Sequence, residues 1–154
     1  MSSTDPPPFP TNRSMPESAV VPVLHYRSVA EAVAWLCVAF GFTERLRIGD
    51  HRAQLTTASG LGSVVVAEGS EATVPLPSST HSIMVRVSDV DGHHEQAKTA
   101  GARVLAAPET YPYGERQYSA VDLGGHVWTF SQTVANVEPS RWGGVLTGEE
   151  PGAV

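Results

Sequence analysis

The stretch VDLGGHVWTF, residues 121–130, combines a tight turn with a strongly alternating segment. An aspartate followed by two glycines is typical of a turn between antiparallel strands. After the turn, Trp128 and Phe130 share one side of a strand, and Val127 and Thr129 share the other. The bulk of Trp128 and Phe130 predicts that their side packs against a helix. Thr129 is then expected to face a cavity.

His126 stands at the corner of this turn, where it could be a metal ligand or a structural residue. By alternation it lies on the side of Trp128, at the mouth of the strand. We therefore favour a hydrogen bond from His126 to the backbone or to Asp122. His93 and His94 lie in the first turn of a polar predicted helix, where exposure to solvent is expected.

The order of elements that ends in this hairpin occurs twice in the chain, which is the firmest organisational signal. Each copy is a strand, a helix and three further strands, as shown by β-branched runs, helical spacing and glycine-rich turns. The first copy comprises AVVPVLHYRS, VAEAVAWLCVAFGF, TERLRI, RAQLTT and SVVVAE. The second comprises HSIMVRVSDV, GHHEQAKTAGA, RVLAAP, RQYSAVD and HVWTFSQ. Asp89 or Asp91 is the predicted cap of the second helix.

The repeat also sets the predicted domain limits. Residues 1–19 hold five of the 12 prolines and predict a disordered or loosely packed tail. Residues 20–132 form one domain of two modules, about 20–70 and 81–132, joined by EATVPLPSST. Residues 133–154 form a C-terminal segment.

Several short motifs occur in a recognisable order: AFGF at the end of the first helix, VRVSDVDG at the start of the second copy, and YPYGERQYSAVDLGGHVWTF at its end. With the repeat, they resemble the vicinal oxygen chelate superfamily of glyoxalase I, extradiol dioxygenases and bleomycin-resistance proteins. The likeness is greatest to its PhnB-like branch. The resemblance implies an α+β fold in which two βαβββ modules form a half-open mixed-sheet barrel with helices outside. It also implies a homodimer.

In metal-using members of this superfamily, the ligands lie on the first and last strand of each module. Carried over to this chain, the first-strand positions are Val21 and Ser82, and the last-strand positions are about Val66 and Thr129. None is a normal ligand of a divalent metal. We therefore expect no metal ligand and no cofactor. A register shift of one residue would place His81 at the position of Ser82.

Alternation and loop composition predict which side chains line the cavity. His25 shares the parity of Val21 and Val23, so it is the one candidate for a catalytic acid or base, although it could equally be a binding donor or part of the wall. Arg86 and Met84 lie on the polar side of their strand, and Gly114 allows a sharp turn in the loop YPYGER. The candidate ligand-binding residues are His25, Gln54, Met84, Arg86, Tyr113, Arg116 and Thr129.

Composition excludes several classes of partner. The net charge is −6, lysine occurs once, and the arginines are scattered, which argues against nucleic acid. No apolar run is long enough to cross a bilayer, and no signal peptide is evident, so a cytoplasmic location is expected. The single cysteine, Cys37, excludes an intramolecular disulfide. A small molecule is the expected partner.

Three functions remain open from the sequence. The favoured hypothesis is metal-independent binding of a small organic molecule in the barrel cavity, as in antibiotic sequestration. The alternative is a metal-dependent lyase, isomerase or dioxygenase, so the sequence leaves open whether the protein is an enzyme. That alternative requires two or more of these candidate ligands to converge: His25, His51, His81, Glu68 and His126. A third hypothesis is a structural or regulatory domain whose own side chains fill the cavity.

Overall fold

The computed structural model describes residues 5, 9–69 and 81–148, and it confirms the repeated order of elements. The linker predicted over residues 71–80 lies outside the described residues. The first module consists of β1 (Val23–Tyr26), α1 (Val29–Phe40), β2 (Thr43–Ile48), β3 (Arg52–Thr56) and β4 (Ser63–Glu68). The second consists of β5 (Ile83–Arg86), α2 (Val90–Thr99), β6 (Arg103–Thr110), β7 (Glu115–Val121) and β8 (Val127–Thr133), followed by the short 3-10 helix η1 (Pro139–Trp142).

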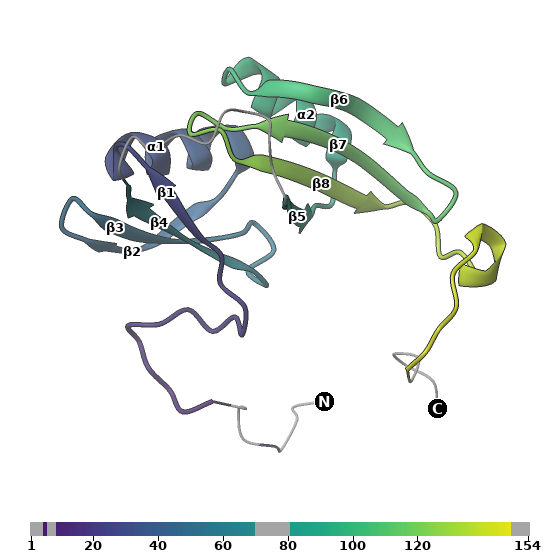
Figure 1. The fold of residues 1–154 in the computed structure, drawn as a ribbon, viewed down its shortest axis with the longest axis horizontal. Coiled ribbons are helices and arrows are strands. Elements are labelled where there is room, and N and C mark those ends of the chain that lie inside the picture. Colours follow the sequence, from purple (N-terminus) through teal and green to yellow (C-terminus); the bar gives the residue numbers. More distant parts are fainter. Residues whose placement is uncertain (1–4, 6–8, 70–80, 149–154) are drawn as a thin grey trace.

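Each module forms its own mixed four-stranded sheet. The strand orders are β1-β4-β3-β2 and β5-β8-β7-β6, and in each sheet the first pair is parallel and the other pairs are antiparallel. Among the described residues the two sheets do not pair with each other, so the barrel stays half open (Figure 1). This arrangement confirms the predicted fold class.

Helix boundaries follow local capping chemistry. The Ser28 side chain accepts a hydrogen bond from the Glu31 N–H at the start of α1, and Gly41 ends the helix in the left-handed region at φ +74°. Asp89, one of the two predicted caps, accepts a hydrogen bond from the Gly92 N–H. Since Asp89 is the cap, α2 begins at Val90 and not at Gly92. In the part of the chain that the structure describes, neither helix is long and apolar enough to span a membrane.

One hydrophobic core joins the two modules. The α1 residue Phe40 packs against Trp128 and Phe130 of β8, with ring centroids 5.6 and 4.7 Å apart. Trp128 and Phe130 are fully buried on the helix-facing side of their strand, as alternation predicted. We call the opposite face of each sheet, which points away from the helices, its open face.

His93 is partly buried against this core, so the expectation of solvent exposure was wrong for this residue. Its ring stacks on Phe40, its Nε2 donates to the Phe40 carbonyl at 3.0 Å, and its Nδ1 accepts from the Tyr118 hydroxyl. Burial lowers the pKa of the imidazole, which therefore favours the neutral form that these two bonds require. The periodicity of a polar helix could not show that α1 covers this position.

Candidate ligand-binding site

The turn at residues 122–126 ties the second module to the first. Asp122 is buried, and its Oδ1 accepts from the N–H groups of Gly124 and His126, both at 2.9 Å. Its Oδ2 accepts from the Tyr26 hydroxyl at 2.6 Å and from the Trp128 Nε1 at 3.0 Å. A single carboxylate thus holds its own turn, the following strand and β1 of the other module.

His126 completes this junction and has a structural role. Its Nε2 donates to the His25 carbonyl at 2.9 Å, and its ring meets the Tyr26 ring edge to face at 4.8 Å. A Cβ at Gly124 would lie 2.5 Å from the Tyr26 ring, so only glycine allows this approach. Burial, together with the neighbouring Asp122, raises the pKa of the Tyr26 phenol, which therefore remains a donor.

The residues at the implied metal positions do not fit a divalent ion. Val66 is fully buried in the core, so it does not lie on the open face as the implied last-strand position requires. The β4 residues on the open face next to it are Val65 and Ala67. The Thr129 hydroxyl is bonded to Ser119. Valine, alanine and single hydroxyl groups supply no ligand set for such an ion. Within the described residues, no three histidine, cysteine, aspartate or glutamate side chains are grouped so that they could hold a metal.

The open face of the second sheet carries neutral polar groups in register. Met84 of β5 pairs with Thr129 of β8, which pairs with Ser119 of β7, and the Ser119 and Thr129 hydroxyls are 2.9 Å apart. Met84 is 60% exposed beside them, so this row offers an apolar contact next to hydroxyl groups.

A second row lies one rung further along the strands. Arg86 pairs with Ser131, which pairs with Gln117. The Ser131 hydroxyl accepts from the Gln117 amide at 3.0 Å and donates to the Glu115 carboxylate at 2.8 Å. The Tyr113 hydroxyl donates to the Gln117 amide oxygen at 3.2 Å, which connects the loop to this row. Three predicted residues of this module, Met84, Arg86 and Thr129, therefore share one face, with Tyr113 at its border.

On the first sheet, the chain itself covers the predicted residue Gln54. The Gln54 amide donates to the Ser14 carbonyl at 2.9 Å and accepts from Arg45 at 2.5 Å, and Arg45 also donates to the Arg13 carbonyl at 2.9 Å. Pro16 of the same N-terminal segment is buried. Gln54 faces the side that alternation predicted, but it already has partners on that side.

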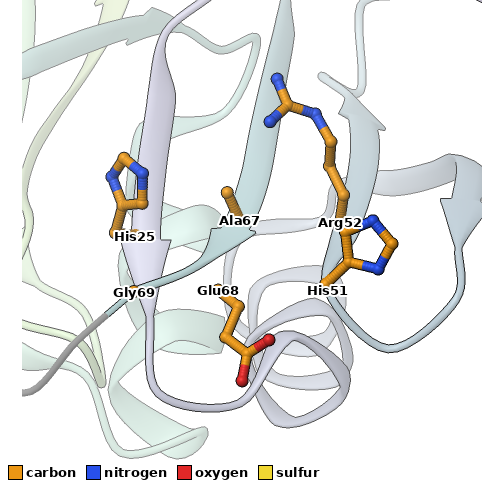
Figure 2. A pocket seen from close by; sticks show the side chains of 6 residues that line it. All are labelled: His25, His51, Arg52, Ala67, Glu68 and Gly69. Atoms are coloured by element: carbon orange, nitrogen blue, oxygen red, sulfur yellow. The ribbon is translucent and has the colours of Figure 1, made fainter.

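The adjacent rung of the first sheet is open. His25 of β1 pairs with Ala67 of β4, which pairs with Arg52 of β3, and all three extend on the same side of the strands (Figure 2). They line a cavity of about 530 Å³ together with His51, Glu68 and Gly69. The Glu68 carboxylate points to the opposite side of the strands (Figure 2). His25 therefore lies apart from the polar rows of the second sheet.

The structure does not bring Arg116 to an open face. Alternation places it on the side of Tyr118, which is in the core, and its guanidinium makes a salt bridge with Asp91 of α2 at 3.0 Å. The sequence motifs placed Arg116 both at the end of the YPYGER loop and at the start of the predicted strand RQYSAVD. In the structure β7 begins at Glu115, so Arg116 lies within the strand and its side chain faces α2.

Alternation along the last strand placed Ser131 with Thr129 on the cavity side, but sequence reasoning missed Ser119, Gln117 and Arg52. The first two could have been found by applying the same alternation to RQYSAVD. Arg52 could not, because its importance depends on pairing with β4, and strand order within a sheet is not visible in one sequence.

Comparison with known proteins gives a consistent picture. The family model described as Glyoxalase/Bleomycin resistance protein/Dioxygenase superfamily matches residues 21–130. No curated protein matches the chain.

Among solved structures, TioX from Micromonospora sp. ML1 is 37% identical, with a TM-score of 0.61, and the match covers 75% of this chain and 98% of TioX. The fosfomycin resistance protein FosX from Listeria monocytogenes is 16% identical, with a TM-score of 0.60, 75% of this chain covered and 92% of that one. A glyoxalase/bleomycin resistance protein/dioxygenase family enzyme from Burkholderia phytofirmans PsJN is 18% identical, with a TM-score of 0.60 and coverages of 73% and 96%. At these identities, the last two show a shared fold.

Proposed function

Because this chain belongs to the Glyoxalase/Bleomycin resistance protein/Dioxygenase superfamily, we propose that it binds a small organic molecule on its open faces without a metal ion. The observation that carries this proposal is the pair of polar rows on the second sheet. The Thr129 and Ser119 hydroxyls lie beside the exposed Met84, and the Gln117 amide and the buried Ser131 hydroxyl form the next row beside Arg86. A few oriented polar groups next to apolar surface are typical of small-molecule sites.

In this proposal the protein holds its ligand unchanged, so it would sequester a toxic compound such as an antibiotic. FosX is a fosfomycin resistance protein, but at 16% identity it supplies a precedent for the fold only. Membership in the PhnB-like branch and a cytoplasmic location are further parts of the proposal, and both depend on the sequence motifs and composition.

A homodimer belongs to the same proposal. In the described part of the chain, β1 and β5 each pair on one side only, and Val23 and Met84 leave apolar surface exposed on the open faces. A second copy that covered these faces would enclose the ligand and shield it from water.

The test is a thermal-shift screen of the full chain against a panel of antibiotics that includes bleomycin. A binder should raise the midpoint of unfolding progressively with ligand concentration, and a chelator should leave the rise unchanged. Thr129→Val removes the hydroxyl at nearly constant volume and is expected to reduce the shift. Stabilisation that requires added Zn²⁺, Mn²⁺, Ni²⁺ or Fe²⁺ would support the metal-dependent alternative instead.

A further inference from the structure

We propose that His25 and Arg52 form a separate binding site for an oxyanion, either a carboxylate or a phosphate group, at the open end of the first sheet. Figure 2 shows the two side chains extending on the same side of their strands, with the Ala67 methyl group between them. The backbones of their strands are two strand spacings apart, about 10 Å, and long side chains can converge across that distance.

The two groups are available for a ligand. Among the described residues, neither the His25 imidazole nor the Arg52 guanidinium has a hydrogen-bond or ion-pair partner. The other arginines on this sheet differ in this respect: Arg45 binds Gln54 and the Arg13 carbonyl, and Arg47 binds Glu44. A half-buried guanidinium without a partner retains its full set of donors for an incoming group.

The chain creates room for a ligand between these side chains. Ala67 is the smallest side chain that the middle strand could present, and the cavity here measures about 530 Å³. A Cβ at Gly69 would lie 2.6 Å from the Cβ of His25, so glycine lets the backbone pass close beneath the imidazole. On the neighbouring rung, the N-terminal segment already covers Gln54, which limits the site to this end of the sheet.

The chemistry favours an oxyanion over other ligands. The planar guanidinium binds carboxylate and phosphate oxygens with two parallel hydrogen bonds, and the imidazole can donate a third. Glu68 is the acidic residue among the described residues that line the cavity, and its carboxylate points to the other side of the strands (Figure 2). Because the chain carries a net charge of −6, its overall field repels anions, and binding depends on these local donors.

The experiment is a titration of the isotope-labelled full chain with sodium acetate and, separately, with sodium phosphate, followed by NMR. Chloride is exchanged for the test anion at constant ionic strength and pH. We expect saturable shifts of the backbone amides of Arg52, Ala67 and Gly69 and of the His25 ring with at least one anion. A response to acetate alone assigns a carboxylate, a response to phosphate alone assigns a phosphate group, and a response to both assigns a general oxyanion site.

Variants separate this site from surface charge. Arg52→Gln and His25→Gln should each weaken binding about tenfold, since each removes donors to a charged group. Arg52→Lys keeps the charge without the paired donors and should bind with intermediate strength. Arg141→Gln removes the same charge from an exposed position outside the sheets and should bind as the native chain does.

No saturable shift with either anion, or equal binding by the native chain and Arg52→Gln, would overturn the proposal. Because the polar rows lie on the other sheet, the two proposals can fail separately. The organic-ligand proposal is tested by Thr129→Val, which leaves His25 and Arg52 unchanged.

Discussion

The buried Asp122 carboxylate accepts four hydrogen bonds, from the Tyr26 hydroxyl, the Trp128 Nε1 and the backbone N–H groups of Gly124 and His126. Asp122→Asn replaces one oxygen with an amide that cannot accept from the Trp128 Nε1. We expect the free energy of unfolding to fall by about 3 kcal/mol, since a buried indole N–H loses its partner and a charged acceptor is removed. Urea denaturation of the purified chain measures this loss.

The control is Asp91→Asn, which makes the same change at an exposed carboxylate paired with Arg116. Because solvent screens that pair, the free energy of unfolding should fall much less in Asp91→Asn than in Asp122→Asn. Similar losses at the two positions would contradict the role assigned to Asp122.

We expect His93 to make the free energy of unfolding depend on pH. Since burial lowers its pKa in the folded state below the ordinary value of 6.5, the unfolded chain binds the proton more readily. This contribution to stability is therefore complete above pH 6.5 and is lost as the pH falls through the folded-state pKa. Between pH 7.5 and pH 5, we expect the native chain to lose more of its free energy of unfolding than His93→Gln does.

Chemical denaturation at a series of pH values provides the measurement. His51→Gln, at an exposed histidine in a turn, is the control and should keep the native pH dependence, since this side chain lies outside the core. Parallel pH profiles for the native chain and His93→Gln would show that His93 does not cause the dependence.

At the scale of elements, the β6–β7 hairpin is fixed by Gly114, which combines a positive φ of +86° with close packing. The carbonyl of Gly114 accepts from the N–H groups of Val134 and Ala135, and a Cβ would lie 2.3 Å from the Ala135 carbonyl oxygen. Gly114→Ala is expected to cost about 3 kcal/mol, because the segment after β8 must move away. Thermal or urea unfolding of the variant checks this value.

Gly60 provides a matched control for this substitution. It has a similar φ of +77°, but a Cβ there would meet nothing within 4 Å. Gly60→Ala therefore reports the backbone strain alone, about 1 kcal/mol. If Gly114→Ala and Gly60→Ala lower the free energy of unfolding by the same amount, packing against Ala135 does not contribute to the cost at Gly114.

The elements themselves were largely predictable from the sequence because they depend on local signals. Alternation placed Trp128 and Phe130 in the core and Thr129 on the open face, and Asp89 was one of two predicted caps. The candidate site was less predictable, because it depends on pairing between distant segments. Nothing in the sequence around Gln54 shows that the Ser14 carbonyl covers it, and nothing around Arg116 shows that α2 supplies its partner.

At the scale of the whole molecule, the two modules share one core, and among the described residues the N-terminal segment covers only the part of the first open face around Gln54. Phe40 of the first module packs on β8 of the second, and Asp122 of the second holds Tyr26 of the first. The modules are therefore fixed to each other on the helix side. In the proposed homodimer, a second copy of the chain would pack on the rest of the open faces.

The proposed homodimer makes a prediction that two matched substitutions can test. Light scattering should give twice the chain mass of 16.3 kDa. Val23→Glu places a carboxylate on the open face, where Val23 is 43% exposed on the free edge strand β1, and a buried unpaired charge there should dissociate the dimer. Val38→Glu makes the same change on α1, where Val38 is 64% exposed, and should leave the dimer intact. An interface built on the open faces should be disrupted by Val23→Glu and not by Val38→Glu. A native chain with the mass of a monomer, or a dimer that dissociates with Val38→Glu and not with Val23→Glu, would therefore show that the open faces do not meet.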